Sequence, residues 1–527
     1  MRKRWWVAAA TVWLAAAATL NVAGQGGSAG DVVARAAAAL GGRDRVLAVN
    51  TLTVEGYGQL AYQNGGGNVT SSPDAPQKWI TVNDHRREID LRQWRMVVRQ
   101  RQANDFVFAG VSGMRGTVSR QGVDGDVAFN LAGTADSPTA TRASAAAARA
   151  RRMEMFAHPL TIVRAALAPA ARVTNRRSQN GLLLVDVTIP QGDVMTMAVD
   201  AQSGLPAWVQ WIGPDANLGD LTYRAAFTGY QPVGGLRLPT GLNTTIDFRN
   251  VVQSKLYVDR QAVDTPLSAV PSLDAVRAVA PPAPPAPVIE VTEVAKGIWY
   301  LRGQGNSTLF EFDDHLTLYE AYGSEANARA IIARARSLVP GKPLTEVIVS
   351  HHHFDHTGGL RAAVAEGLTI VTQRGNEALL REMASRPARL FPDSLGRSPK
   401  PIRIRAVDDQ LKLRDASMEI DVYRVVANSH MADALLVHVP RERLLLQGDL
   451  FDVNWEIYWW GSSYDDNVRY RNLQVDRDVP VHGRIAPIGE VRAGIAKQIA
   501  AAQALCASVD AAGLSMRGCP VKLTVDR

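Results

Sequence analysis

The stretch SHHHFDHTGG, residues 350–359, places four imidazoles and a carboxylate within six consecutive positions. It follows the apolar run 347–349, which predicts a buried strand. His351 and His353 are two positions apart, so in an extended segment their side chains face the same side, and His352 points away from them. Imidazole and carboxylate are common ligands of zinc and other first-row metals. We therefore interpret the stretch as a metal-binding loop rather than as a solvated polar loop that happens to be rich in histidine.

Two metal ions need more ligands than His351 and His353 supply. Asp355 and His356 follow where the chain turns, and they can face a second point nearby. Three further ligand-type residues, His430, Asp449 and His482, each stand at the end of an apolar run. Functional loops are commonly placed in this way on a rigid sheet. The pattern predicts two metal ions a few ångströms apart, with open positions for water and substrate.

The remaining histidines do not fit this pattern. His438 lies inside an alternating run and is expected on a strand face, and His315 beside two aspartates is expected in a turn. His85 and His158 are isolated in the first half of the chain, where no catalytic constellation is apparent.

The order of these residues resembles the metallo-β-lactamase superfamily, over about residues 288–527. The family pattern is S-x-H-x-D-H-x-G-G, then a single His, then G-D, then a final His; this chain has one extra His after His351. The resemblance implies an αββα sandwich of two mixed sheets with helices outside. It also implies that His351, His353 and His430 hold one metal, that Asp355, His356 and His482 hold the second, and that Asp449 bridges both.

Two positions refine that resemblance. β-Lactamases of this fold generally have Cys or Ser where Asp449 stands, so the Gly-Asp pair is more similar to glyoxalase II, lactonases and related ester or phosphoester hydrolases. The family also has an early Asp in a D-x-G-like turn, whereas this chain has Glu320 there. Glutamate is one methylene longer than aspartate, so altered support of the histidine loop is expected.

The metals imply the mechanism. Zinc lowers the pKa of bound water to about 7, so the expected enzyme is a hydrolase with two zinc ions, acting on an ester, thioester, lactone or related bond of a small-molecule substrate. Asp355 is the candidate catalytic residue that orients the nucleophile or relays its proton. One alternative is a mononuclear iron relative that oxidises sulfur compounds; the flavodiiron variant has Glu where His353 stands. The other alternative is a non-enzymatic periplasmic protein that binds an apolar ligand.

A chain of 527 residues predicts two domains, and a proline-rich linker at 280–288 separates them. Short alternating segments across 25–279 predict an antiparallel β-rich domain, with helices at 31–40 and 144–167. The phrases at 199–206 and 234–239 resemble those of periplasmic lipoprotein-carrier proteins, which implies a curved sheet closed by helices around an apolar cavity. With the sandwich at 289–527, the fold class expected for the whole chain is α+β.

The start of the chain predicts export from a bacterial cell. A basic segment at 1–4 precedes an alanine-rich apolar stretch at 5–20, which is shorter than a membrane span. We interpret residues 1–24 as a signal peptide, with an uncleaved anchor as the alternative, and expect a periplasmic or secreted protein. Cys506 and Cys519 either form a disulfide there or remain two buried thiols.

The net charge of +7 comes from 58 Lys and Arg against 51 Asp and Glu. Arginine groups such as 86–87 and 149–152 lie among apolar residues and are expected on solvated faces, not in a nucleic-acid stripe. The basic surface favours membrane-surface or lipid contact through the N-terminal domain. Aromatic residues at 455–460, with Tyr464 and Tyr470, are expected to line the mouth of the site or to pack as a lid. The oligomeric state is left open.

Overall fold

The structure is a computed structural model, and three of the sequence predictions lie outside the part of the chain that it describes. The signal peptide at 1–24, the aromatic run at 455–460 and the Cys506–Cys519 pairing fall on residues or side chains that are not described. Among the described helices, none is long and apolar enough to cross a membrane. The structure describes residues 27–63, 70, 77–104, 116–134, 137–428, 430–454 and 461–511.

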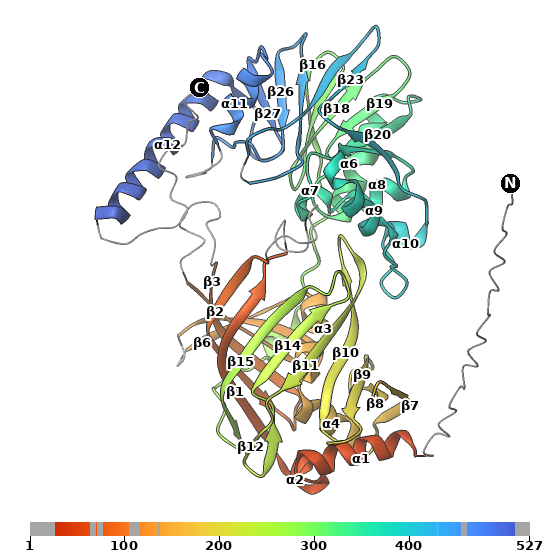
Figure 1. Ribbon diagram of the computed structural model, residues 1–527, viewed down its shortest axis with the longest axis vertical. Helices are drawn as coiled ribbons and strands as arrows, with labels where there is room; N and C mark the ends of the chain where they lie inside the picture. Colours follow the sequence, from red (N-terminus) through yellow and green to blue (C-terminus); the bar gives the residue numbers. More distant parts are fainter. Residues whose placement is uncertain are drawn as a thin grey trace, which may run out of the picture.

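The first half of the chain forms one large antiparallel sheet of 13 strands, which curves around helices (Figure 1). The strand order is β6-β5-β4-β3-β2-β1-β15-β14-β11-β10-β9-β8-β7, so β1 pairs with β15 across about 200 intervening residues. The strands are β1 (Thr51–Ala61), β2 (Trp79–Asp90), β3 (Arg95–Asn104), β4 (Thr117–Asp124), β5 (Val127–Gly133), β6 (Pro138–Arg142), β7 (Arg172–Gln179), β8 (Leu182–Thr188), β9 (Val194–Asp200), β10 (Pro206–Asp215), β11 (Gly219–Thr228), β14 (Gly241–Ile246) and β15 (Val252–Val263). The hairpin of β12 (Gln231–Val233) and β13 (Leu236–Leu238) stands apart.

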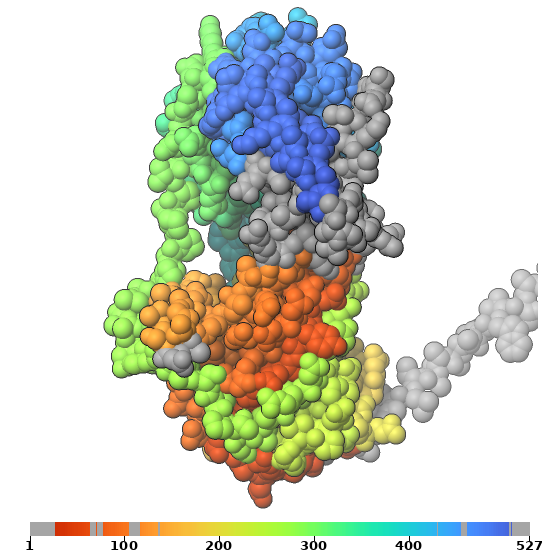
Figure 2. Space-filling view, turned by 90° about the vertical axis from the view of Figure 1, so that its left-hand side faces the viewer, coloured from red at the N-terminus to blue at the C-terminus, as the bar shows by residue number. Residues whose placement is uncertain are grey.

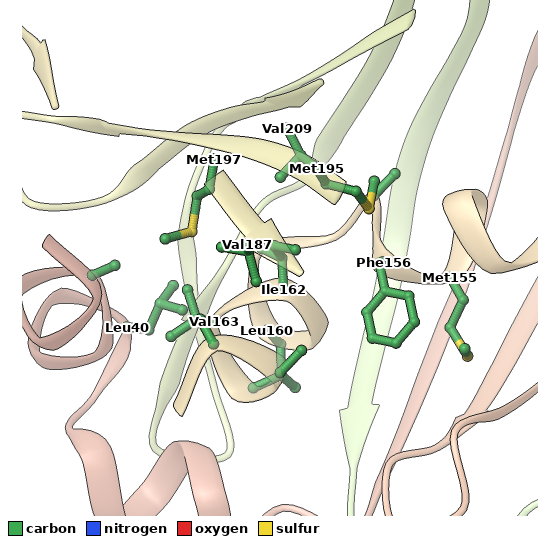
Figure 3. Packing of buried hydrophobic residues seen from close by; sticks show 14 of the residues in the cluster. Leu40, Met155, Phe156, Leu160, Ile162, Val163, Val187, Met195, Met197 and Val209 are labelled. Atoms are coloured by element: carbon green, nitrogen blue, oxygen red, sulfur yellow. The ribbon is translucent and has the colours of Figure 1, made fainter. Parts of the chain in front are cut away.

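Helices cover the inner face of this sheet. They are α1 (Ala29–Leu40), α2 (Arg43–Ala48), α3 (Ala145–Phe156) and α4 (Pro159–Leu167), whereas the short α5 (Asp274–Ala278) packs on the other face, against Phe129 and Leu131 of β5. The structure corrects the single helix expected at 144–167, which is broken into α3 and α4 because Pro159 cannot continue a helix but suits the first turn of a new one. The apolar side of α4 packs on the sheet, and Figure 3 shows Leu160, Ile162 and Val163 among Met195 and Met197 of β9. This packing forms the core of the N-terminal half.

The structure corrects the expectation of solvated arginines for two members of these groups. Arg87 and Arg152 are 7% and 8% exposed. Arg87 pairs with Glu154 at 2.5 Å, and Arg152 pairs with Asp126 and Asp193 at 2.8 and 3.1 Å. The covering of β2 by α3 buries them, and charged side chains are tolerated in such places only when they are paired. A local sequence pattern does not indicate a partner that lies 26 to 67 residues away.

The second half is a sandwich of two sheets with helices on both outer sides, as the αββα expectation states. Its first sheet comprises β16 (Glu290–Ala295), β17 (Ile298–Arg302), β18 (Asn306–Glu311), β19 (Leu316–Tyr319), β20 (Leu344–Ile348), β21 (Thr369–Gln373) and β22 (Arg403–Val407). The second comprises β23 (Gln410–Arg414), β24 (Glu419–Arg424), β25 (Leu435–Val439), β26 (Leu444–Gln447), β27 (Arg477–Pro480) and β28 (Ala486–Pro487). The helices are α6 (Glu325–Leu338), α7 (Phe354–Thr357), α8 (Leu360–Ala365), α9 (Glu377–Ser385), α10 (Ser394–Arg397), α11 (Ser463–Tyr470) and α12 (Ile488–Ala511).

The two halves are stacked, and the connecting chain runs along one side of the molecule (Figure 2). Residues 279–288 have no helix or strand and are largely exposed. The halves share one buried apolar cluster, in which Leu218, Leu221 and Phe248 of the first half join residues of α6, α8 and β20. The division of the chain at 24, 279 and 288 stays a prediction, because no comparison separates these segments.

Candidate metal centre

The histidine loop begins where β20 ends and leads directly into the short helix α7. His351 and His353 lie in the loop, and Asp355 and His356 lie on α7. The backbone N–H groups of His356 and Thr357 both donate to the carbonyl oxygen of His353, at 3.0 and 2.9 Å, and this closes the turn. His351, His353 and His356 are at most 4% exposed. The loop therefore presents its imidazoles to the interior of the protein.

The first group of ligand-type residues contains His351, His353, His430 and Asp449, with one candidate atom of each within 4.8 Å of all the others. Oδ2 of Asp449 is 2.8 Å from Nε2 of His430, 3.4 Å from Nε2 of His351 and 3.8 Å from Nδ1 of His353. A tetrahedral zinc with bonds of about 2.1 Å separates its ligands by about 3.4 Å. The spacing of this group fits such an ion.

The second group contains Asp355, His356 and His482. Nε2 of His356 and Nε2 of His482 are 3.3 Å apart, and they lie 3.6 and 3.4 Å from Oδ2 of Asp355. Oδ1 of Asp449 is 3.0 Å from Nε2 of His356 and 3.1 Å from Nε2 of His482. Asp449 thus directs one carboxylate oxygen to each group. The structure brings together all seven residues that the sequence proposed as ligands.

The donor set fits a bound cation. Nε2 of His351 and Oδ1 of Asp355 are buried without a hydrogen-bond partner, whereas buried polar atoms are nearly always paired in native proteins. Both atoms belong to residues of the two groups. Imidazole nitrogen and carboxylate oxygen are the ligand types that zinc and other first-row metals take. His352 lies in neither group, as its position in the loop predicts.

The electrostatics of the site are those of a metal-binding cluster. Burial and the neighbouring imidazole of His356 lower the pKa of His351 to about 3, and burial with His351 does the same for His353. Both rings are therefore neutral near pH 7, which metal binding requires. Burial would raise the pKa of Asp449, but the imidazoles of His356 and His351 outweigh it and hold that pKa well below its usual range.

The second group holds protons in the absence of metal. Burial alone would lower the pKa of His356, but the carboxylates of Asp449 and Asp355 raise it well above 6.5. Burial would also lower the pKa of His482, whereas hydrogen bonds to the same two carboxylates raise it to about 9. A metal ion must displace these protons, so binding at the second group is expected to weaken as the pH falls.

Glu320 stands behind the histidine loop, at the place of the early Asp of the resemblance. Its Oε1 accepts a hydrogen bond from the backbone N–H of Ser350 at 2.7 Å and lies 3.5 Å from Nδ1 of His356. The backbone of Glu320 has φ of 66°, a conformation that non-glycine residues rarely adopt. Oγ of Ser350 is 2.9 Å from Nδ1 of His351 and 3.3 Å from Nδ1 of His356. Despite its extra methylene, Glu320 therefore supports the loop.

Two residues that the sequence analysis did not single out also support the site. The hydroxyl of Tyr322 donates to Oδ2 of Asp355 at 2.9 Å, and its ring lies edge-on to His356 and His482. Gln447 accepts hydrogen bonds from the backbone N–H groups at 450 and 451, which closes the turn that carries Asp449. In the sequence, only their positions indicated such a role: Tyr322 lies two residues after Glu320, and Gln447 lies two residues before Asp449.

The other candidates do not reach the centre. Tyr464 is fully buried in the apolar cluster under α11 and α12, so it does not line the mouth of the site. Tyr470 is half-exposed on α11. His438 lies on β25, where its Nε2 is 2.9 Å from the carbonyl oxygen of Gln474, and His315 stacks on Phe312 in a turn. Both agree with the places expected for them.

Comparison with known proteins agrees with this geometry. A family model described as the metallo-beta-lactamase superfamily matches residues 300–462. These residues belong to the metallo-beta-lactamase superfamily. A linear primary-alkylsulfatase from a Pseudomonas species is 36% identical over 75 residues, which are 14% of this chain and 11% of that protein. The chain thus matches about a tenth of the length of this curated relative. The family and this relative support an enzyme of the metallo-beta-lactamase fold and leave its substrate open.

Two solved structures are similar to this chain at low sequence identity. The metallo-beta-lactamase from Pontibacter korlensis has 15% identity and a TM-score of 0.33, with 40% of this chain and 99% of that protein covered. A stereoselective inverting sec-alkylsulfatase from a Pseudomonas species has 17% identity and a TM-score of 0.32, with 45% of this chain and 46% of that protein covered.

Proposed function

We propose that this protein is an exported hydrolase that uses two zinc ions to cleave an ester, thioester, lactone or related bond. The observation that carries the proposal is the placement of Asp449, whose two carboxylate oxygens face two separate groups of ligand-type residues. Zinc bound there would supply an acidified water as the nucleophile and a Lewis acid for the substrate oxygen. The alkylsulfatase relative adds sulfate esters to the candidate bonds.

The residues of the chain have distinct roles in this proposal. His351, His353 and His430 would hold the first ion; His356 and His482 would hold the second with Asp355; Asp449 would contact both. Asp355 is the proposed catalytic group. Its Oδ2 accepts a hydrogen bond from the hydroxyl of Tyr322, whereas its buried Oδ1 has no hydrogen-bond partner and could orient an attacking water.

A matched pair of variants tests the metal centre. His353→Ala removes a proposed ligand, and His352→Ala removes the neighbouring imidazole that lies in neither group. We expect the purified protein to contain two zincs and to hydrolyse at least one member of a panel of thioesters, lactones, phosphodiesters, alkyl sulfates and β-lactams. His353→Ala should lose metal and turnover, while His352→Ala should keep both. Equal activity of the two variants, with folding checked by circular dichroism, would contradict the proposal.

The same metal analysis separates the alternatives. One iron per chain would favour the sulfur-oxidising chemistry, and no bound metal would favour a binding protein. The export proposal rests on the basic start and the apolar stretch at 5–20. It predicts that the protein made in a bacterial host is recovered from the periplasm or the medium with its first 24 or so residues removed. Recovery of the full-length chain from the cytoplasm would contradict it.

A second function is proposed for the N-terminal half, because it contains an open cavity of about 660 Å³. This volume is in the range of small-molecule sites. The floor is the sheet, with Leu242 and Leu256, and the roof is α3, whose alanines are too small to fill the space. Ala146, Ala147 and Ala150 are three of these alanines. We propose that the cavity takes an apolar ligand such as an acyl chain, which agrees with the expected lipid contact.

A fluorescent fatty-acid analogue tests this second function. Ala150→Trp would place an indole in the cavity and should weaken binding of the analogue at least tenfold. Ala170→Trp, at an exposed position of the same half, is the matched control and should bind like the unchanged protein. Unaltered binding to Ala150→Trp would show that the analogue binds elsewhere.

A further inference from the structure

We infer that the N-terminal half positions the metal-ligand helix α7 through the side chain of Asn217, and that the second ligand group depends on this contact. The inference rests on the proposed metal centre. It assigns a positioning residue for that centre to a half of the chain that contains none of the seven ligand candidates.

Asn217 lies in the turn between β10 and β11, and that turn is held in one conformation. Oδ1 of Asp215 accepts hydrogen bonds from the backbone N–H groups of Asn217 and Leu218, both at 2.9 Å. Gly219 has φ of 65°, and a Cβ atom there would lie 2.3 Å from the carbonyl oxygen of Pro387 in the other half. Only glycine permits so close an approach. The turn is therefore shaped to press against the C-terminal half.

The side chain of Asn217 reaches the backbone that carries the ligands. Its Nδ2 donates to the carbonyl oxygen of Phe354 and to Oγ1 of Thr357, both at 2.9 Å. Oγ1 of Thr357 in turn donates to the carbonyl oxygen of His353 at 3.0 Å. Asn217 and Thr357 are 5% and 0% exposed, so water does not compete for these bonds. One amide group thus holds both ends of the segment that presents Asp355 and His356.

Helix α7 needs support from outside its own sequence. It has only four residues, and no side chain caps its N-terminus. A single helical turn is unstable alone, because nucleation fixes several residues for one hydrogen bond. The contact from Asn217 supplies part of what the local sequence lacks.

The surrounding contacts fix Asn217 relative to α7. The carboxylate of Asp220 accepts hydrogen bonds from the backbone N–H groups of residues 389, 390 and 391, at 2.7 to 3.1 Å. Arg386 donates to the carbonyl oxygens of Leu218 and Asp220 and to Oδ1 of Asp247, each at 2.8 Å. Leu218 is fully buried in the cluster that the halves share. The two halves are thus joined directly beside the metal-ligand helix.

The test uses Asn217→Asp, which keeps the shape of the side chain but removes both donated hydrogen bonds. Partners that orient metal ligands typically contribute 10- to 100-fold to metal affinity. We expect the ion of the second group to bind roughly 10- to 100-fold more weakly in the variant, and the ion of the first group to bind as before. The readout is titration with Co²⁺, followed by its visible absorption and by competition with a chelator. Asn243→Asp, on the exposed side of β14, is the control and should bind both ions normally.

A second variant keeps the inference testable if Asn217→Asp does not fold. Thr357→Val removes the hydroxyl between Asn217 and His353 with little change in shape, and it should also weaken one ion selectively. Normal affinity for both ions in either folded variant would overturn the inference. The proposed metal centre is tested by the unchanged protein. It is wrong if that protein binds no metal. If the unchanged protein binds two ions and the variants bind them equally well, the metal centre is supported and only the role of Asn217 is wrong.

Discussion

At the scale of single residues, the site is organised around carboxylates that differ in charge. Asp449 is held ionised by the imidazoles of His356 and His351. Asp478 is also fully buried, and burial together with the carboxylate of Asp452 raises its pKa well above the usual range. The same residue type is thus a negative ligand candidate in one place and a neutral hydrogen-bonding group in the other.

This difference predicts opposite outcomes for one chemical change. Asp449→Asn removes the charge shared by the two groups and should reduce the bound metal from two ions to one or none, with loss of turnover. Asp478→Asn replaces a carboxyl that is already neutral, and the amide oxygen can still accept the hydrogen bond from Gln447. We expect its metal content and kcat to stay within a few-fold of the unchanged protein. Metal analysis and steady-state kinetics measure both; equal losses in the two variants would contradict the assignment.

Tyr322 provides a second prediction at this scale. Tyr322→Phe removes the hydrogen bond to Asp355 but keeps the ring that lies edge-on to His356 and His482. Asp355 would then be less firmly oriented, and we expect kcat to fall roughly tenfold with little change in the free energy of unfolding. Tyr470→Phe, at a half-exposed position on α11, is the control. A kcat equal to that of the control would show that Tyr322 does not orient Asp355.

At the scale of elements, the start of α4 is a pH-sensitive feature. Nδ1 of His158 accepts a hydrogen bond from the backbone N–H of Leu160 and caps the helix, while Nε2 lies 3.2 Å from Oε1 of Gln261 on β15. The ring is 1% exposed. Burial and the nearby Arg87 lower the pKa of His158 to about 3. The folded protein therefore holds this imidazole neutral, with Nδ1 as an acceptor.

His158 makes the stability of the N-terminal half depend on pH. The unfolded chain takes up a proton at His158 near pH 6.5, whereas the folded protein does so only near pH 3. His158 therefore makes its full contribution to the free energy of unfolding above pH 6.5, and this contribution is lost as the pH falls towards 3. Between pH 7 and pH 5 the loss is about 2 kcal/mol, at 1.36 kcal/mol per pH unit.

A capping variant that does not titrate tests this dependence. His158→Asn can cap α4 but carries no ionisable group. Between pH 7 and pH 5 its free energy of unfolding should fall by about 2 kcal/mol less than that of the unchanged protein. Urea denaturation at the two pH values measures this difference, in which the contributions of the other histidines cancel. Parallel losses in both proteins would exclude His158 as the source.

At the scale of the whole molecule, the two halves are held together by direct contacts as well as by the connecting chain (Figure 1). Arg249 pairs with Glu382 at 2.6 Å, and Arg386 and Asp220 bind the backbone of the opposite half. Leu221 and Phe248 are buried in the shared apolar cluster. We therefore expect the halves to remain associated when the chain between them is cut.

A protease site placed within residues 280–287 tests this expectation, because that segment is largely exposed. After cleavage, the two fragments should co-elute in size-exclusion chromatography and keep their metal. Asp220→Ala combined with Arg386→Ala removes contacts across the interface and should shift the cleaved protein towards separate fragments. Separation of the fragments without these substitutions would show that the interface is weaker than its contacts suggest.

The sequence by itself indicated the seven ligand candidates, because that information is local, and the order of their motifs resembles a family whose fold implies the αββα sandwich. Each candidate stands next to a strand or on a turn that its neighbours specify, such as the Gly-Asp pair after β26. The structure places the seven side chains within reach of one another, and their binding of metal stays a prediction. Helix α1 was also apparent from its local pattern.

Only the tertiary structure decided which distant residues meet. These contacts join residues 33 to 211 positions apart: β1 with β15, Arg87 with Glu154 of α3, Tyr322 with Asp355, and Asn217 with α7 in the other half. The type of a residue indicates its chemistry, and the local periodicity of the sequence indicates its secondary structure. What it touches is set by packing of the whole chain, since burial and hydrogen bonding depend on neighbours that only the folded molecule brings together.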